Sequence, residues 1–376
     1  MSVLRRLGIV IAGGGVAALE TALALRTLAP ELVDITLVAP TDRFGFRAAS
    51  VGEPFDRAEV HRFDLAAICA DIGVGLHRGV LTAVDPEDHS ATIGADMTIA
   101  YDALVVACGA EARPVVPGAL VFGGPQDVEA LRALVGAIEA GDIRSVAFAI
   151  PASVGWTLPA YELALLTAGR ADPRVAISIV TPEEEPLAAF GGEASAEVRR
   201  LLAERGIEVH LRQTPAEFSD GLLRTQPGDE LPVDRVVALP RLTGVPIAGL
   251  PATHDGLLRT DGFGRVDNLS DVYAAGDITA FPVKQGGIAA EQADAVAEML
   301  ASEAGADVTP RPFEPVLRGV LMTGEEDRFL RADLAGGRGS TGAADARALW
   351  WPPTKVSGRY LAPYLAALEV GDSQLT

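Results

Sequence analysis

The sequence predicts an α/β fold with two doubly wound parallel sheets and a small α+β domain at its C-terminal end. An apolar run at 9–12 passes through a glycine turn into an alanine- and leucine-rich helix that ends near Leu28. A similar strand, turn and helix pattern returns at 145–169, and the composition changes after Pro310. Alternation of strands and helices is typical of parallel sheets covered by helices on both faces.

Length and composition exclude several classes of protein. A chain of 376 residues is long enough for two or three domains, and its net charge of −20 repels phosphate backbones, so we expect no nucleic-acid partner. Its two cysteines, Cys69 and Cys108, form no zinc or disulfide pattern, which predicts a reducing, cytoplasmic location and no metal. No apolar run approaches the ~18–20 residues of a membrane span.

The glycine turn follows the dinucleotide-binding pattern GxGxxA. It comprises Gly13, Gly14, Gly15, Val16, Ala17 and Ala18. Gly13 permits the tight turn, Gly15 lets the backbone approach a pyrophosphate, and Ala18 lets the helix pack closely on the strand. The free N–H groups at the start of the helix favour a diphosphate at this position.

The next strand, expected at 34–38, departs from the usual pattern. The acid that normally binds a ribose is replaced by Ala39, which Pro40 follows. Arg43 and Arg47 in the next loop either contact phosphate or flavin or are solvated. A further strand is expected at 76–84, with Val80 as a backbone contact for an adenine.

Three segments together carry a family resemblance: GGGVAALE at 13–20, YDALVVACGA at 101–110 and VYAAGDITA at 272–280. In this order the chain resembles the FAD-dependent pyridine nucleotide-disulfide oxidoreductases, which have two Rossmann-like domains. The resemblance implies that FAD binds and that Asp277, after Gly276, holds its ribityl or phosphate part. It also places further contacts at Ala107, Cys108, Gly109, Lys284, Gly287 and Ile288.

The same resemblance implies a division of the chain. Residues 1–115 and 245–309 would form a discontinuous FAD-binding domain, and 116–244 an NAD(P)-binding-like domain inserted into it. Residues 310–376 would form a C-terminal cap. In the FAD domain, the helix after Gly287 would direct its N-terminus at the flavin, and Lys284 is a catalytic candidate there because it would add positive charge.

The second nucleotide-binding turn lacks its glycines. The strand at 145–150 runs into Pro151, which has no N–H to offer a phosphate, and into the bulky Trp156. The sequence then reads Pro-Ala-Tyr-Glu at 159–162, which resembles the sulfide:quinone oxidoreductase and flavocytochrome c sulfide dehydrogenase branch. No cysteine follows Cys108, so that branch's nucleophiles are missing. Trp156, a second catalytic candidate, either covers the flavin or belongs to the core.

The C-terminal part is expected to contain a hairpin at 316–334, a glycine-rich loop at 336–342 and a stiff aromatic segment from Trp350 to Leu365. That segment could close over the flavin, dock weakly on a membrane surface, seal a homodimer or fold back on the body.

For function, the leading hypothesis is an FAD-dependent oxidoreductase that passes electrons from a small-molecule donor to a quinone or similar acceptor. One alternative is an NAD(P)H-dependent reductase, which Pro151 and Trp156 disfavour. The other is a non-catalytic FAD-binding partner protein.

Overall fold

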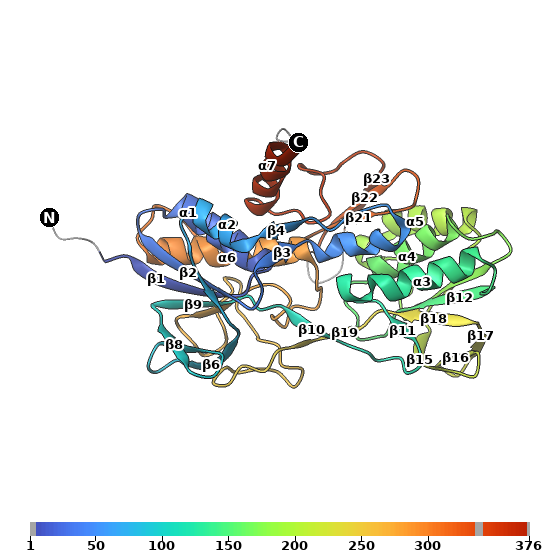
Figure 1. The fold of residues 1–376 in the computed structure, drawn as a ribbon, viewed down its shortest axis with the longest axis horizontal. Coiled ribbons are helices and arrows are strands. Elements are labelled where there is room, and N and C mark those ends of the chain that lie inside the picture. Colours follow the sequence, from blue (N-terminus) through green and yellow to red (C-terminus); the bar gives the residue numbers. More distant parts are fainter. Residues whose placement is uncertain (1–4, 335–340, 374–376) are drawn as a thin grey trace.

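The computed structural model describes residues 5–334 and 341–373, and its core consists of two parallel sheets that lie side by side with helices against them (Figure 1). Most of the expected glycine-rich loop at 336–342 falls outside the described residues.

The first sheet has the strand order β20-β9-β1-β2-β5, and every pairing in it is parallel. Its strands are β1 (Leu7–Ala12), β2 (Val33–Ala39), β5 (Gly75–Arg78), β9 (Ala103–Val106) and β20 (Val272–Ala274). The helices beside it are α1 (Val16–Leu28), α2 (Leu65–Asp71) and α6 (Gly286–Glu303). Because β20 joins this sheet after the second sheet is complete, the two units are nested, as predicted.

The second sheet has the order β11-β18-β12-β13-β14 and is also parallel. Its strands are β11 (Leu120–Val121), β12 (Ser145–Ala149), β13 (Ala176–Val180), β14 (Glu208–His210) and β18 (Arg235–Ala238). Helices α3 (Val128–Glu139), α4 (Leu158–Ala168) and α5 (Gly192–Glu204) pack against it. Helix α4 is apolar on nearly every side and is almost completely buried.

Smaller antiparallel sheets complete the two units. The first carries β3 (Arg43–Gly45) with β4 (Arg62–Asp64), and β6 (Leu81–Asp85), β7 (Ser90–Ile93) and β8 (Met97–Ala100). The second carries β15 (Thr214–Ser219), β16 (Leu222–Gln226) and β17 (Glu230–Pro232). Between the units, β10 (Ala110–Arg113) pairs with β19 (Arg241–Gly244), so the two crossing segments of the chain are hydrogen-bonded to each other (Figure 1).

The single strand expected at 76–84 is wrong. The chain breaks at Gly79 into β5, which joins the parallel sheet, and β6, which pairs with β7. A side chain at Gly79 would collide with Ile93, since a Cβ there would lie 2.3 Å from its Cγ2. The break therefore lets the chain change sheets at a point where another strand approaches closely.

The C-terminal part forms the sheet β21 (Val316–Leu321), β22 (Arg328–Asp333) and β23 (Thr341–Asp345), followed by helix α7 (Leu361–Ser373). The expected hairpin is β21 paired with β22. Helix α7 stands on the α1 and α2 side of the first unit (Figure 1) and buries Leu361 and Leu365 there. Within the described residues, no helix is both long enough and apolar enough to cross a bilayer.

Candidate functional site

One cavity of about 1250 Å³ runs between the two parallel sheets and reaches the C-terminal sheet. It is larger than the roughly 300–1,000 Å³ of ordinary small-molecule sites. Its wall is built from both glycine turns, the loop after β2, the segment after β20, and Gly319, Val320, Lys355 and Val356 from the C-terminal part. A long cofactor and a second small molecule can therefore share it.

The first glycine turn opens into this cavity. Gly13 has φ of +144°, and a Cβ there would lie 2.1 Å from the carbonyl oxygen of Ala107, so only glycine fits. A Cβ at Gly15 would meet nothing within 4 Å, and Gly15 precedes α1 without capping it by a side chain. The first N–H groups of α1 are thus left for an anion.

Packing explains why Ala39, and not an acidic residue, stands at the end of β2. Ala39 is 1% exposed and lies behind the turn, where a Cβ at Gly14 would come within 2.9 Å of its Cβ. A longer side chain at 39 would press on the glycine turn. The ribose-binding function usually supplied at that position is therefore not available from residue 39.

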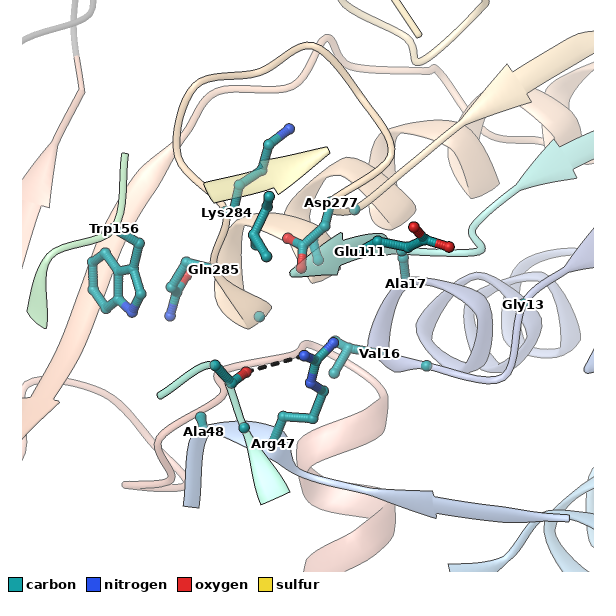
Figure 2. Close-up of a pocket in the computed structure, with 18 of the residues that line it drawn as sticks. Gly13, Val16, Ala17, Arg47, Ala48, Glu111, Trp156, Asp277, Lys284 and Gln285 are labelled. Carbon is teal, nitrogen blue, oxygen red and sulfur yellow. Dashed lines mark hydrogen bonds between the residues drawn. The ribbon is translucent and has the colours of Figure 1, made fainter. Parts of the chain in front are cut away.

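Asp277 lies at the centre of the cavity wall (Figure 2), and no hydrogen-bond donor among the described residues satisfies its carboxylate. Burial raises its pKa, while the charges of Lys284 and Arg47 oppose that rise. An acidic group held this deep without a protein donor is a suitable acceptor for the hydroxyl groups of a bound cofactor.

Lys284 also lines the cavity, but its ammonium group donates to the carbonyl oxygen of Thr279 and points away from Asp277 (Figure 2). Burial lowers its pKa to about 8, with Asp277 opposing the change. Its charge therefore acts on the cavity from behind the loop and not by contact with Asp277.

Helix α6 begins at Gly286, beside the cavity. Its N-cap, Gln285, accepts a hydrogen bond from the N–H of Ile288 at 2.9 Å and donates to the carbonyl oxygen of Arg318 at 3.0 Å. The first turn of α6 contains no acidic residue, so the positive end of its dipole is not neutralised. This end favours negative charge on a group bound at Gln285.

The second glycine turn packs against the first unit instead of standing open. A Cβ at Gly155 would lie 1.9 Å from the carbonyl oxygen of Pro282. Glu183 follows β13, at the position where a ribose-binding acid is usually found. Its carboxylate is already hydrogen-bonded to other side chains of the protein. It accepts hydrogen bonds from Tyr161 at 2.7 Å, Thr181 at 2.9 Å and Thr157 at 3.0 Å.

Trp156 stands at the cavity wall opposite the first turn, beside Gln285 (Figure 2). Its ring lies 5.8 Å from that of Phe190, at a tilt of 58°. The side chain thus belongs both to the core, through Phe190, and to the cavity surface, so the two alternatives left open by the sequence do not exclude each other.

Sequence reasoning missed a buried ion pair on the cavity wall. Glu162 of α4 is 1% exposed, and its Oε1 lies 2.6 Å from Nζ of Lys355. The same oxygen accepts from the N–H of Met322 at 3.0 Å, and Lys355 also reaches the carbonyl oxygen of Ala48 at 3.4 Å. Burial raises the pKa of Glu162, and Lys355 opposes that rise. The available signal was a lone acid within the apolar helix sequence.

Most predicted site residues come together in this cavity. Its wall includes Gly13, Gly15, Val16, Ala17, Pro40, Arg43, Arg47, Val80, Ala107, Cys108, Gly109, Trp156, Gly276, Asp277 and Lys284. The remaining four lie behind that wall: Ala18, Ala39, Gly287 and Ile288. Their contribution to cofactor binding stays a prediction, and their small or buried side chains pack the turn and α6.

The aromatic C-terminal segment folds back on the protein. The ring of Trp350 packs against Phe329 at 5.2 Å and its Nε1 donates to Thr354, whereas Trp351 is 88% exposed. The residues that follow the two tryptophans reach the cavity, through Lys355 and Val356, whereas the tryptophans themselves do not line it.

Comparison with known proteins decides the family. The model of the pyridine nucleotide-disulphide oxidoreductases matches residues 7–304. This chain belongs to that family. FAD is its cofactor, and the chain is an FAD-dependent oxidoreductase. No curated protein sequence matches it.

Several solved structures share the fold of this chain at low sequence identity. Sulfide:quinone oxidoreductase from the hyperthermophilic bacterium Aquifex aeolicus superposes with a TM-score of 0.80 at 20% identity, over 90% of this chain and 86% of that one. The ferredoxin reductase of the CYP199A2 system from Rhodopseudomonas palustris gives 0.66 at 21%, over 88% and 83%. An NAD-dependent persulfide reductase from A. fulgidus gives 0.62 at 18%, over 87% and 64%.

The described cysteines do not form a redox pair in this family member. Both are free; Cys69 is buried in the core, and Cys108 lines the cavity. Burial raises the pKa of the Cys108 thiol to about 11, so it stays protonated at neutral pH and is a poor nucleophile.

We therefore expect Cys108→Ala to change the rates of FAD reduction and reoxidation by less than about twofold, since a protonated thiol does not act as a nucleophile. Stopped-flow absorbance of the purified holoprotein measures both rates. In the same protein, iodoacetamide at about pH 8 should leave Cys108 unmodified by mass spectrometry until the protein is unfolded. Rapid labelling of the folded protein would contradict the assignment.

Proposed function

We propose that this flavoprotein oxidises a small-molecule donor and reduces a quinone or a similar acceptor that takes up two electrons and two protons, without cysteine or nicotinamide chemistry. FAD, when bound, supplies the electron transfer. The observation that carries the proposal is the Glu162–Lys355 pair on the cavity wall. Such an acceptor needs protons delivered where water is excluded, and a buried ammonium–carboxylate pair can deliver one.

The steps assigned to the protein are binding and proton delivery. Trp156 and Val356 offer apolar surface to a flat ring, and the first turn of α6 favours negative charge beside it. Lys355 donates a proton to an acceptor oxygen and is reprotonated through Glu162. Each acceptor molecule takes two electrons and two protons; the pair supplies one proton at a time, and solvent restores it.

Nicotinamide is disfavoured as the donor by the second turn. Gly155 packs on the backbone of Pro282, and Glu183 already accepts three protein hydroxyl groups. A dinucleotide would have to displace both contacts. Anaerobic mixing of the oxidised holoprotein with NADH or NADPH should therefore leave the flavin absorbance unchanged, and rapid bleaching by either would favour the NAD(P)H-dependent alternative.

The test of the acceptor uses protein reduced chemically and then mixed anaerobically with a water-soluble short-chain quinone or with ferricyanide. Ferricyanide takes one electron and no proton, so it serves as the control acceptor. In Lys355→Arg the cation remains beside Glu162, but a guanidinium does not give up its proton. We expect quinone reduction to slow about 100-fold in this variant and ferricyanide reduction to be unchanged.

Glu162→Gln tests the other half of the pair by the same measurement and should slow only the quinone reaction. If the wild-type protein reduces ferricyanide but no quinone, the proposed acceptor is wrong. If Lys355→Arg slows both acceptors equally, the pair does not deliver protons.

A further inference from the structure

The turn at 276–279, which we call the aspartate turn, follows β20 and carries Asp277. Gly276 has φ of +83°, a conformation that favours glycine. A Cβ there would also lie 3.2 Å from the Cβ of Ala17 and 3.5 Å from that of Ala289. The aspartate turn therefore lies between the beginnings of α1 and α6, beside the N–H groups of α1 that are predicted to bind the diphosphate of FAD.

A buried side chain of α6, Gln292, ties the two ends of the aspartate turn together. It is 6% exposed. Its Oε1 accepts the N–H of Gly276 at 2.8 Å, and its Nε2 donates to Oγ1 of Thr279 at 3.2 Å. Because a backbone N–H can only donate, the amide oxygen has to face Gly276, which leaves the amide nitrogen for Thr279. A glutamine therefore supplies the one acceptor and the one donor that this turn uses.

Thr279 closes the aspartate turn from inside. Its hydroxyl and its N–H both donate to the carbonyl oxygen of Gly276, at 2.9 Å and 3.0 Å. Since the hydroxyl proton is used in this way, the hydroxyl oxygen can accept from Gln292. Lys284 donates to the carbonyl oxygen of Thr279. These bonds all end on the backbone or on Thr279, so they leave the carboxylate of Asp277 for a ligand.

Burial makes the hydrogen bond between Gly276 and Gln292 important for the position of the turn. Gly276 is buried, and Thr279 is 1% exposed. Without the oxygen of Gln292, the N–H of Gly276 would have no acceptor in a place that is removed from solvent, which is unfavourable. The turn would then shift to satisfy this N–H. Because Asp277 is the next residue, its carboxylate would move with the backbone.

We propose that Gln292 is a positioning residue for the cofactor: it holds the aspartate turn so that Asp277 presents its carboxylate to the hydroxyl groups of FAD. Gln292 does not line the cavity, so it acts through Asp277 and not by contact with the cofactor. Asp277 itself lies on the cavity wall, as does Ala17 beside the turn (Figure 2). The inference concerns the retention of FAD, and it does not depend on the donor or acceptor of the proposed function.

The rate at which the holoprotein releases FAD tests this proposal. The purified, oxidised holoprotein is diluted, and release is followed by the change in flavin fluorescence. Gln292→Met keeps the length of the side chain but replaces the amide by a thioether, which is a much weaker acceptor. We expect this variant to release FAD about tenfold faster than wild type, a factor that corresponds to the loss of one buried hydrogen bond.

A double variant distinguishes positioning from a general loss of structure. Asp277→Asn alone should release FAD about tenfold faster or more, because it weakens the acceptor for the cofactor hydroxyl groups. Adding Gln292→Met to Asp277→Asn should then change the release rate by less than about twofold, since the contact is already lost. If the two factors multiply, or if Asp277→Asn releases FAD at the wild-type rate, the proposal is overturned.

Two further variants complete the design. Thr279→Val removes the partner of Gln292 Nε2 and should speed release in the same way, which keeps the test available if Gln292→Met folds poorly. Glu298→Gln is the matched control, because this buried residue of α6 bonds to Arg311 at 2.7 Å and not to the aspartate turn. It should release FAD at the wild-type rate. Equally fast release from Glu298→Gln and Gln292→Met would mean that any disturbance of α6 is sufficient, and would overturn the proposal.

Discussion

Gly13→Ala is expected to abolish FAD retention and to lower the free energy of unfolding by about 2–4 kcal/mol. A methyl group at this position would lie 2.1 Å from the carbonyl oxygen of Ala107 and 2.5 Å from its carbonyl carbon. These are backbone atoms at the end of β9, so they cannot rotate away as a side chain would. The φ of +144° adds strain for any residue with a Cβ.

The flavin-to-protein absorbance ratio of the purified variant measures cofactor retention, and denaturant unfolding measures stability. Gly15→Ala is the matched control, because a Cβ there meets nothing within 4 Å and projects toward the cavity. It should leave the stability of the apoprotein within about 0.5 kcal/mol of wild type while weakening FAD binding. A stable, yellow Gly13→Ala protein would show that the turn is not packed as described.

Lys355→Met is expected to destabilise the protein by about 3–5 kcal/mol, because it leaves the carboxylate of Glu162 buried without its cation. The double variant Glu162→Leu/Lys355→Met should recover most of that loss, since it removes both charges from the same apolar surroundings. Denaturant unfolding of wild type, Glu162→Leu, Lys355→Met and the double variant forms a double-mutant cycle. A coupling energy of about 1–3 kcal/mol is expected.

The penalty of Lys355→Met should also depend on pH. The pKa of Glu162 is already raised by burial, and loss of Lys355 raises it further. A carboxyl group with a raised folded-state pKa is more stable protonated, so the penalty shrinks as pH falls and grows as pH rises. Arg113→Met, which breaks an exposed pair with Glu111, is the control and should cost no more than about 0.5 kcal/mol at any pH. A coupling near zero would mean that Glu162 and Lys355 do not meet in solution.

The parts of the site that the sequence predicted are those encoded by local spacing. Gly13, Gly15 and Ala18 lie within six residues, and a strand, a tight turn and a helix N-terminus constrain them together. Asp277 was predicted because it follows an apolar strand and a glycine. Both turns end parallel strands of one sheet, so they had to meet at the same edge.

The sequence was less informative where a residue's contacts come from parts of the chain that are distant in sequence. Lys284 was expected to add its charge at the flavin, and it lines the cavity, yet its ammonium group is held by the carbonyl oxygen of Thr279. The strand expected at 76–84 failed because its apolar pattern cannot show that Ile93 approaches Gly79 from another strand. Both outcomes depend on neighbours that are distant in sequence.

By itself, then, the sequence determined the strand, turn and helix that begin each of the two units and the absence of a cysteine pair, because each follows from residue types and their spacing along the chain. Only the tertiary structure decided which buried charges meet. Glu162 and Lys355 are 193 residues apart, and the carboxylate of Glu20 accepts the N–H of Leu361, which is 341 residues away. The physical reason is that a buried charge must find its partner in space, and the packing of helices α1, α4, α6 and α7 supplies that partner.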